Sequence, residues 1–263
     1  MIFYFFKIIM WGQMSSIEKI NRDCPVWEKL LAEVNDTVKH EPDLEEFFAK
    51  SILNFSDIES SISYVLANQL QQNGFDLEKT QSIIYNAFIS EENAYEKIIT
   101  DINTVFDRDP ACITYYQPIL FFKGFQSLQV YRAANHYWKK GNKATAFYLQ
   151  SRASQIFDID IHPAAVIGKG VLMDHATGLV IGETATVGDG CSIFHDVTLG
   201  ATGSQTGDRH PKVGKNVTIS ANVSILGNIK IGDNVKIGAS SLVLEDLPAN
   251  CTAVGVPAKI KKQ

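Results

Sequence analysis

Asp160 and His175 have the residue types and the spacing that suit removal of a proton from a hydroxyl group. A carboxylate beside an imidazole fixes the imidazole tautomer and stabilises the imidazolium, while the other ring nitrogen accepts a proton. The alternative is a surface histidine with no catalytic role. The pair predicts a general base, His175, that Asp160 orients.

Four further charged residues suit the binding of a small zwitterion. Arg209 and His210 are adjacent in the segment GDRHP, and a guanidinium presents a planar fork that matches a carboxylate. Asp174 and Glu183 lie near His175 and would attract an ammonium group. An ordinary salt bridge in a loop is the alternative for Arg209. Together these residues favour a substrate with both an ammonium and a carboxylate.

Other chemistries do not fit the spacing. A zinc site of the carbonic anhydrase kind would need three convergent histidines, two of them close in sequence, and the six histidines include no such pair. Cys191 is expected to pack in the wall of the fold and not to act as a nucleophile. P-loop and GxSxG motifs are absent from the sequence. We therefore predict no metal site.

Composition indicates a folded chain with two domains. The 263 residues are 45% hydrophobic, and the formal net charge of −5 disfavours binding to nucleic acid or to an anionic membrane. The four cysteines are far apart and form no CxxC motif. Cysteines in this arrangement favour a reducing, cytoplasmic setting.

Residues 1–14 (MIFYFFKIIMWGQM) are an apolar N-terminal extension of uncertain status. No basic region precedes the apolar run, no cleavage site follows it, and the run is too short to span a bilayer. We expect an extension ahead of a start at Met14; a membrane signal and an extra packed segment are the alternatives.

Residues 15–157 are predicted to form an α-helical N-terminal domain, because apolar residues recur at helical spacing between capping and stop signals. An aromatic stripe of Phe121, Phe125 and Tyr131 is expected to lie in the helix core. The helical segments are 25–42, 56–74, 76–90, 92–107, 123–140 and 143–157.

Residues 158–263 follow a period of six. Short strands with a tight corner every six residues would close a triangular coil of about 18 residues, which predicts a parallel β-solenoid. The branched apolar residue of each hexad would point inward. The inward positions are Ile161, Ile167, Met173, Ile181, Val187, Ile193, Leu199, Val213, Ile219, Ile225, Ile231, Ile237 and Val243.

The period is interrupted twice, between Met173 and Ile181 and between Leu199 and Val213. Inserted residues must leave the wall, since otherwise the apolar residues would turn outward. Insertions in repeats form loops, and loops often carry function. The loop predicted at 200–212 carries Arg209 and His210, and the shorter break follows Asp174 and His175.

The chain closely resembles the serine O-acetyltransferases of bacterial and plant cysteine biosynthesis, a family with a left-handed parallel β-helix. The resemblance covers most of residues 100–260 and rests on RDPA (108–111), KGFQSLQVYR (123–132), DIHPAAVIGKGVLMDHATGLVIGETA (160–185), GDRHPKVG (207–214), ILGNIKIG (225–232) and GVPAKI (255–260).

The resemblance implies transfer of an acetyl group from acetyl-CoA to the hydroxyl of L-serine. It implies His175 as the base and Asp160 as its partner, in a direct attack on acetyl-CoA. Asp109 and Asp174 would hold the serine ammonium. The residues expected around the carboxylate and the pocket wall are Arg209, His210 and Glu183.

Acetyl-CoA is expected as a co-substrate, with no permanently bound cofactor. The matching positions for it are Ala201, Thr202, Ala221, Lys236, Ala239 and Lys259. Two segments depart from the family pattern, GATG (200–203) and ISAN (219–222), and both add bulk near the expected groove. We expect these departures to affect affinity more than activity.

The resemblance also implies partners. The site residues would meet between neighbouring solenoids of a homotrimer, and the helical domains would pair two trimers into a hexamer. L-Cysteine is expected as a feedback inhibitor. The chain ends at Gln263 without the isoleucine-terminated tail of many relatives, so we do not expect a stable complex with O-acetylserine sulfhydrylase.

Two alternatives stay open at this point. One is a hexapeptide acetyltransferase for a sugar or another amino acid such as homoserine. The other is a catalytically silent solenoid that acts as a scaffold. A scaffold has no need for the charged set that includes Asp160, His175, Arg209 and His210.

Overall fold

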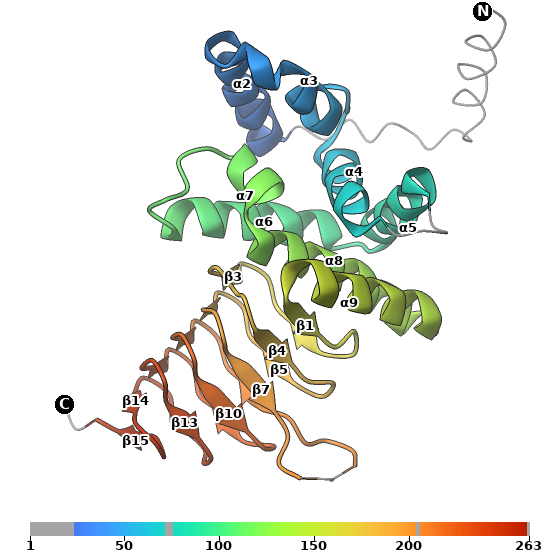
Figure 1. Ribbon diagram of the computed structural model, residues 1–263. Helices are drawn as coiled ribbons and strands as arrows, with labels where there is room; N and C mark the ends of the chain where they lie inside the picture. The colour runs from blue at the N-terminus through green and yellow to red at the C-terminus, as the bar shows by residue number, and fades with distance from the viewer. Residues whose placement is uncertain (1–23, 72–75, 204–205, 262–263) are drawn as a thin grey trace, which may run out of the picture.

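The computed structural model describes residues 24–71, 76–203 and 206–261. Helices occupy one end of the molecule and a tapering stack of β-coils the other (Figure 1). The predicted fold class, an α-helical N-terminal part followed by a parallel β-helix, is confirmed. The apolar extension predicted over residues 1–14 lies outside the described residues.

The helices begin where the sequence supplies caps. Asp57 and Asp76 accept hydrogen bonds from the backbone N–H groups of Ser60 and Lys79, which are otherwise unpaired at a helix start. The α-helices are α2 (Pro25–His40), α3 (Glu45–Phe48), α4 (Ile58–Leu70), α5 (Leu77–Ser90), α6 (Ala94–Arg108), α7 (Tyr116–Phe121), α8 (Lys123–Lys139) and α9 (Lys143–Phe157), with a 3₁₀ turn η1 (Pro42–Leu44) and a π turn η2 (Ala49–Leu53).

One prediction for the helical part is wrong in a single position. Phe125 and Tyr131 are buried as expected, but Phe121 is 53% exposed. Phe121 is the last residue of α7, and Phe122 between the two helices has an extended backbone, so the helical spacing does not continue from Phe121 into α8. The Phe121 ring instead stacks on Phe47.

The β-strands form the three walls of the solenoid. Sheet 1 has the order β1-β4-β7-β10-β13, sheet 2 the order β11-β8-β5-β2, and sheet 3 the order β15-β14-β12-β9-β6-β3. The strands are β1 (Ile159–Ile161), β2 (Val166–Ile167), β3 (Leu172–Met173), β4 (Leu179–Ile181), β5 (Thr186–Val187), β6 (Ser192–Ile193), β7 (Thr198–Gly200), β8 (Lys212–Val213), β9 (Thr218–Ile219), β10 (Ser224–Leu226), β11 (Lys230–Ile231), β12 (Lys236–Ile237), β13 (Leu242–Val243), β14 (Thr252–Val254) and β15 (Lys259–Ile260).

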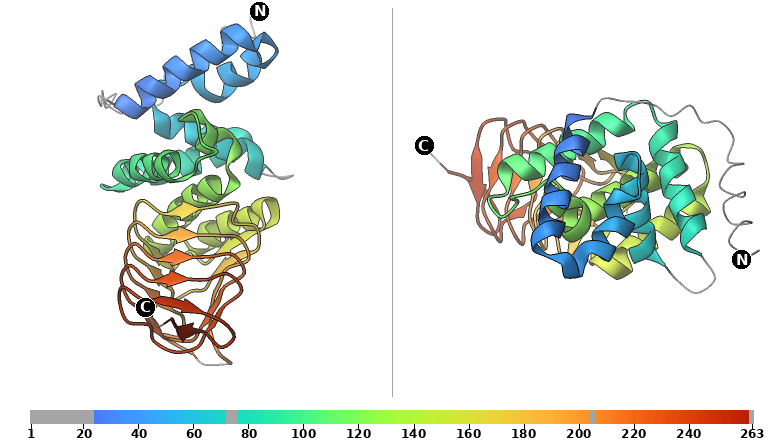
Figure 2. Two further views of the ribbon diagram at one scale, coloured as in Figure 1. Left: turned by 90° about the vertical axis from the view of Figure 1, so that its left-hand side faces the viewer. Right: turned by 90° about the horizontal axis from the view of Figure 1, so that it is seen from above.

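The period of six correctly identified the inner side of the solenoid. All thirteen predicted inward residues, from Ile161 to Val243, are at most 5% exposed. The strands pair in parallel except for β15, which lies antiparallel to β14. The coils stack along one axis, as the left view of Figure 2 shows.

Helix α8 covers the first coil and binds its backbone. The Tyr131 hydroxyl donates to the Ala165 carbonyl at 2.5 Å, and Asn135 Nδ2 donates to the Pro163 carbonyl at 2.8 Å. Arg132 Nη2 donates to the Gly168 carbonyl at 2.8 Å. These bonds satisfy polar groups at a sheet end that has no further coil to pair with.

A buried ion pair adds to this contact. Asp101 of α6 is fully buried; its Oδ2 lies 2.7 Å from Arg132 Nη2, and its Oδ1 accepts from the Gly170 amide at 2.8 Å. Helices α6 and α8 and the first coil therefore share one hydrogen-bonded network, which fixes the helices relative to the strand β3 that precedes His175.

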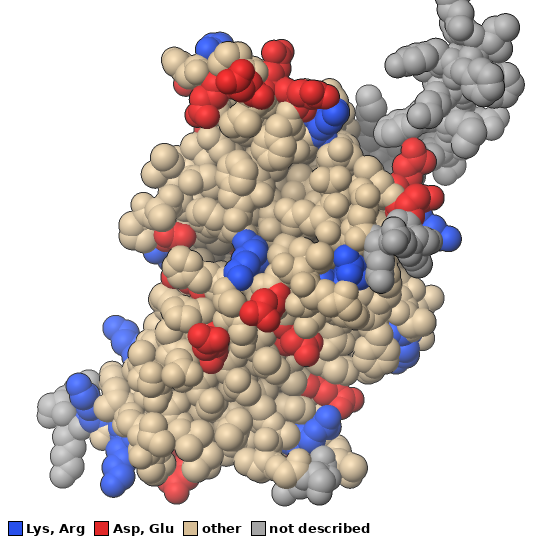
Figure 3. Space-filling model, viewed as in Figure 1, with Lys and Arg blue, Asp and Glu red and all other residues tan. Residues whose placement is uncertain are grey.

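Charges are mixed over the surface. Acidic side chains gather over η1 and α3, whereas Lys and Arg side chains are scattered on the face drawn in Figure 3. Among the described residues, no helix has the length and apolar character needed to cross a bilayer.

Candidate functional site

The first interruption of the period forms a tight corner between sheets 3 and 1. This corner, residues 174–178, lies between β3 and β4 and is called the histidine edge below. His175 and Ala176 have positive φ angles of 54° and 56°, which are uncommon for residues other than glycine. The Ala176 amide bonds to the Asp174 carbonyl, and the His175 side chain is left 77% exposed.

The histidine edge opens onto a hollow of about 400 Å³ between the helices and β3. Asp109, at the end of α6, lines this hollow together with Asp174 and His175. His175 Nε2 lies 3.8 Å from Asp174 Oδ1. Asp109 Oδ1 accepts from the Ala111 amide at 2.9 Å, which holds this carboxylate in place. Two carboxylates and an imidazole thus line one hollow, and Lys123 lines it as well.

His195 is a neighbour of His175 that sequence reasoning missed. It follows β6, which pairs with β3, so it lies at the same corner one coil further on. The two rings are 6.2 Å apart between centroids at an interplanar angle of 76°. His195 Nδ1 is buried without a hydrogen-bond partner among the described residues. The register of the repeat, which aligns Leu172 with Ser192, was the available signal.

The second interruption lies at the next corner, between sheets 1 and 2. The arginine edge is defined here as residues 182–185 between β4 and β5, together with the loop residues 207–211 before β8. Arg209 Nη2 donates to Glu183 Oε2 at 2.8 Å, and this bond is the main cause that lowers the pKa of Glu183. The predicted residues Glu183, Arg209 and His210 therefore lie together.

His210 is held firmly within the arginine edge. It is 7% exposed, and burial is the main cause that lowers its pKa, with the positive charge of Arg209 acting in the same direction. Its ring lies over Gly182, where an added Cβ would come within 2.0 Å of Nε2. Burial likewise lowers the pKa of His162, which lies in the turn after β1.

Asp160 lies in the middle of β1 with a side chain on the outer face of sheet 1. Its Oδ1 accepts from Gln150 Nε2 of α9 at 2.7 Å, and its charge acts on His162. Asp160 pairs in the sheet with Val180, whereas His175 lies in the corner before that strand. No hydrogen bond joins Asp160 to His175 within the described residues, and their pairing stays a prediction.

Four of the six positions predicted for acetyl-CoA divide between the same two rows of corners. Ala221 follows β9 and Ala239 follows β12, so both lie in the row of corners that begins with the histidine edge. Ala201 and Thr202 follow β7 in the row that holds the arginine edge. The two predicted lysines, Lys236 on β12 and Lys259 on β15, belong to sheet 3.

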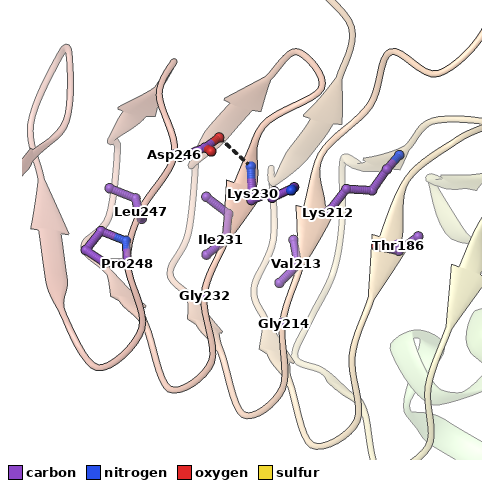
Figure 4. A pocket seen from close by; sticks show the side chains of 10 residues that line it. All are labelled: Thr186, Lys212, Val213, Gly214, Lys230, Ile231, Gly232, Asp246, Leu247 and Pro248. Carbon is purple, nitrogen blue, oxygen red and sulfur yellow. Dashed lines mark hydrogen bonds between the residues drawn. The ribbon is translucent and has the colours of Figure 1, made fainter.

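A second groove lies away from these residues. It measures about 600 Å³ and runs along β5, β8 and β11 of sheet 2, closed at one end by the segment from Asp246 to Pro248 (Figure 4). Asp246 Oδ1 accepts from the Lys230 amide there. The predicted catalytic, serine-binding and acetyl-CoA positions do not line this groove.

Metal binding and nucleophilic attack by a cysteine are the two kinds of chemistry that the sequence did not favour. Within the described ranges, no group of three or more His, Cys, Asp or Glu side chains is arranged to hold a metal ion. Cys191 is fully buried in the solenoid wall, and burial raises the pKa of its thiol to about 11. A thiol with that pKa is protonated at neutral pH and is a poor nucleophile.

Comparison with known proteins points to one family. The sequence model described as "Serine acetyltransferase, N-terminal" matches residues 26–130, and that of the bacterial transferase hexapeptide repeats matches residues 210–244. Serine acetyltransferase of Buchnera aphidicola is 45% identical over 94% of this chain and 89% of its own length. Serine acetyltransferase 4 of Arabidopsis thaliana is 47% identical over 90% of this chain and 66% of its own length.

Solved structures agree. The serine acetyltransferase of Neisseria gonorrhoeae in complex with serine has a TM-score of 0.87 and 42% identity, covering 92% of this chain and 99% of its own. The Brucella abortus enzyme in complex with coenzyme A has a TM-score of 0.88 and 42% identity, covering 90% and 95%. With identity above 40% over nearly the whole length of both partners, the chain belongs to the serine acetyltransferase family.

Proposed function

We propose that this enzyme transfers an acetyl group from acetyl-CoA to the hydroxyl of L-serine. The observation that carries the proposal is the hollow where Asp109, Asp174 and His175 meet, because it offers two carboxylates to an ammonium group and an exposed base to a nearby hydroxyl. Relatives solved with serine and with coenzyme A support the two substrates.

In this proposal His175 accepts the hydroxyl proton while the serine oxygen attacks the thioester carbonyl of acetyl-CoA. The new C–O bond gives a tetrahedral intermediate, which collapses as the C–S bond breaks. The imidazolium then returns its proton to the CoA thiolate, so the base is regenerated and the products are O-acetyl-L-serine and CoA. Arg209 and His210 bind the serine carboxylate, with Glu183 holding the guanidinium.

The two groups of residues belong to different edges of sheet 1, so we infer that a complete site forms where two copies of the chain meet. The histidine edge of one copy would face the arginine edge and Asp160 of the next. A head-to-tail contact of this kind closes into a ring, and a homotrimer is the closed form we propose. Pairing of two trimers through the helical domains would give the hexamer.

Mixed assemblies test this arrangement. At a serine concentration well below the KM of Arg209→Ala, this variant and His175→Ala should each be nearly inactive alone. A seam in a mixed trimer can combine the intact histidine edge of Arg209→Ala with the intact arginine edge of His175→Ala. Random mixing restores roughly a quarter of the seams, because each seam draws one edge from each of two neighbouring copies. Mixing His175→Ala with Asp174→Asn is the matched control, since both changes damage the same edge. The first mixture should recover activity and the control should not. If the first mixture also stayed inactive, the shared site would be contradicted.

A second experiment tests the acceptor. Thiol release from acetyl-CoA should depend on L-serine and be much slower with homoserine or a sugar hydroxyl, because those acceptors place the hydroxyl at a different distance from the charged groups. A faster reaction with another acceptor would mean that this acceptor, and not serine, is the substrate.

Asp160→Asn should also lower kcat, but less than His175→Ala does, since it affects the orientation of the base and not the base itself.

L-Cysteine is proposed as a competitive inhibitor. It differs from L-serine only by a thiol in place of the hydroxyl, so the same charged groups should bind it. We expect cysteine to raise the apparent KM for serine. An unchanged serine KM in the presence of inhibiting cysteine would indicate a separate site.

A further inference from the structure

Thr184 lies at the centre of the arginine edge, in the turn between β4 and β5. Its Oγ1 accepts hydrogen bonds from the backbone amides of Arg209 at 3.0 Å and His210 at 3.1 Å. The same oxygen lies 2.9 Å from His210 Nδ1. One hydroxyl thus contacts three groups of the Arg209–His210 pair.

The backbone of Thr184 adds two contacts. Its amide donates to His210 Nδ1 at 3.2 Å, and its carbonyl accepts from Lys212 Nζ at 2.5 Å. Lys212 Nζ also donates to the His210 carbonyl at 3.1 Å and pairs with Asp208. The loop is therefore tied to the turn on both sides of Arg209–His210.

These contacts determine the tautomer of His210. A backbone amide can only donate, so Nδ1, which receives the Thr184 amide, must be an acceptor. A neutral imidazole with an acceptor at Nδ1 carries its proton on Nε2. An acceptor at Nδ1 also receives the proton of the Thr184 hydroxyl, because the lone pairs of Oγ1 and Nδ1 would otherwise face each other at 2.9 Å.

We propose that Thr184 is a positioning residue that holds Arg209 and His210 as one unit and presents His210 as an Nε2–H donor to the substrate carboxylate. The proposal rests on the proposed function for the identity of that carboxylate, but the positioning itself does not. Thr184 contacts neither substrate in the proposed site and acts only through Arg209 and His210, which it holds in place.

Two matched substitutions separate the hydroxyl from the shape of the side chain. Thr184→Val keeps the volume and branching but removes the oxygen, whereas Thr184→Ser keeps the oxygen. Thr186→Val is the control, because Thr186 lies only two residues further on, at the start of β5, and within the described residues it has no side-chain hydrogen bond to Arg209 or His210.

We expect Thr184→Val to raise the serine KM roughly tenfold to a hundredfold, with kcat within about threefold of the unmodified enzyme and little change in the acetyl-CoA KM. Thr184→Ser and Thr186→Val should stay close to the unmodified enzyme. A general structural defect would instead lower kcat and raise the KM values of both substrates, and the Thr184→Ser variant would show the same defect.

Hydrogen–deuterium exchange of the peptide that contains Arg209 and His210 gives a readout independent of activity. Thr184→Val should expose these two amides to faster exchange, and Thr184→Ser should not. Unchanged exchange in Thr184→Val, or an unchanged serine KM, would overturn the positioning role. If the unmodified enzyme released no thiol with serine, the proposed function would fail, while the exchange result would still decide the role of Thr184.

Discussion

The two edges of sheet 1 differ in how firmly they hold their charged residues. At the histidine edge, His175 is 77% exposed, and its contacts are with Asp174 and His195. At the arginine edge, His210 is 7% exposed and Arg209 is paired with Glu183. The groups proposed to bind the carboxylate are thus preorganised within one chain, whereas the proposed base is left open, as the proposed shared site between two copies requires.

The lengths of the two interruptions explain this difference. The first adds two residues to the period of six, which a corner with two residues of positive φ accommodates. The second adds a loop whose ordering costs conformational entropy for every residue it fixes. Bonds to Glu183 and Thr184 offset that cost, so the longer insertion needs more partners on the wall to hold one conformation.

The largest effect is expected from removing the base. His175→Ala should lower kcat by roughly 10²–10⁴-fold, because a positioned general base contributes about that much. His40→Ala, at an exposed position of α2, is the control and should leave kcat unchanged. Steady-state kinetics on assembled enzyme measures both. Near-normal turnover of His175→Ala would remove His175 from the reaction and leave the histidine edge without its proposed role.

Arg209→Ala should act on binding at the other edge. We expect the serine KM to rise by an equivalent of roughly 2–4 kcal/mol through loss of charge-assisted pairing, with a smaller effect on acetyl-CoA. Arg209→Lys should recover only part of the loss, because an ammonium cannot replace the planar fork. A defect confined to the acetyl-CoA KM would move Arg209 out of the serine pocket.

An added methyl group at Gly124, which lines the hollow beside the histidine edge, and one at Gly182 in the arginine edge compare the rigidity of the two regions. A Cβ at Gly124 of α8 would lie 1.9 Å from the Met173 carbonyl oxygen, and a Cβ at Gly182 would lie 2.0 Å from His210 Nε2. Overpacking costs about 1–3 kcal/mol. We expect Gly124→Ala to lie at the upper end, because a backbone atom must move, and Gly182→Ala at the lower end, because a ring can turn.

Urea unfolding of the two variants measures this difference in the free energy of unfolding. Serine KM should respond in the opposite order, with the larger increase in Gly182→Ala as His210 is displaced. Equal destabilisation with no change in serine KM would mean that the His210 ring is not held as described.

The smallest effect is a pH dependence of stability that belongs mainly to His210 of the arginine edge and to His162 in the turn after β1. Burial lowers the pKa values of His162 and His210 from the ordinary 6.5, so the folded chain binds fewer protons than the unfolded chain near that pH. The free energy of unfolding should therefore fall as the pH decreases through about 6.5. The pKa of Glu183 is lowered from 4.5, so protonation of this residue would decrease the free energy of unfolding only below about pH 4.5.

Unfolding by urea at pH 7.5 and 5.5 checks this expectation. His162→Asn with His210→Asn should flatten the dependence, leaving the part due to His136, whose pKa burial also lowers. If the free energy of unfolding of the double variant changed with pH as steeply as that of the unmodified protein, the effect would belong to the helical part instead.

The sequence by itself predicted much of the solenoid. A period of six decides which side chains point inward, because each strand reverses its facing with every residue and each corner resets the direction. The same period located both interruptions and hence His175, Arg209 and His210. The helix starts at Ile58 and Leu77 were also readable, since capping is local.

Only the tertiary structure decided which of these residues lie together. Asp109 reaches the hollow with Asp174 because α6 and α8 bind the first coil through buried polar contacts, and no period relates a helix end to a solenoid corner. The role of Thr184 and the proximity of His195 depend on side chains meeting across neighbouring coils. The hexads specify a wall, but the separation of the site residues onto two edges follows from three-dimensional closure of the coil, which spacing along the chain does not contain.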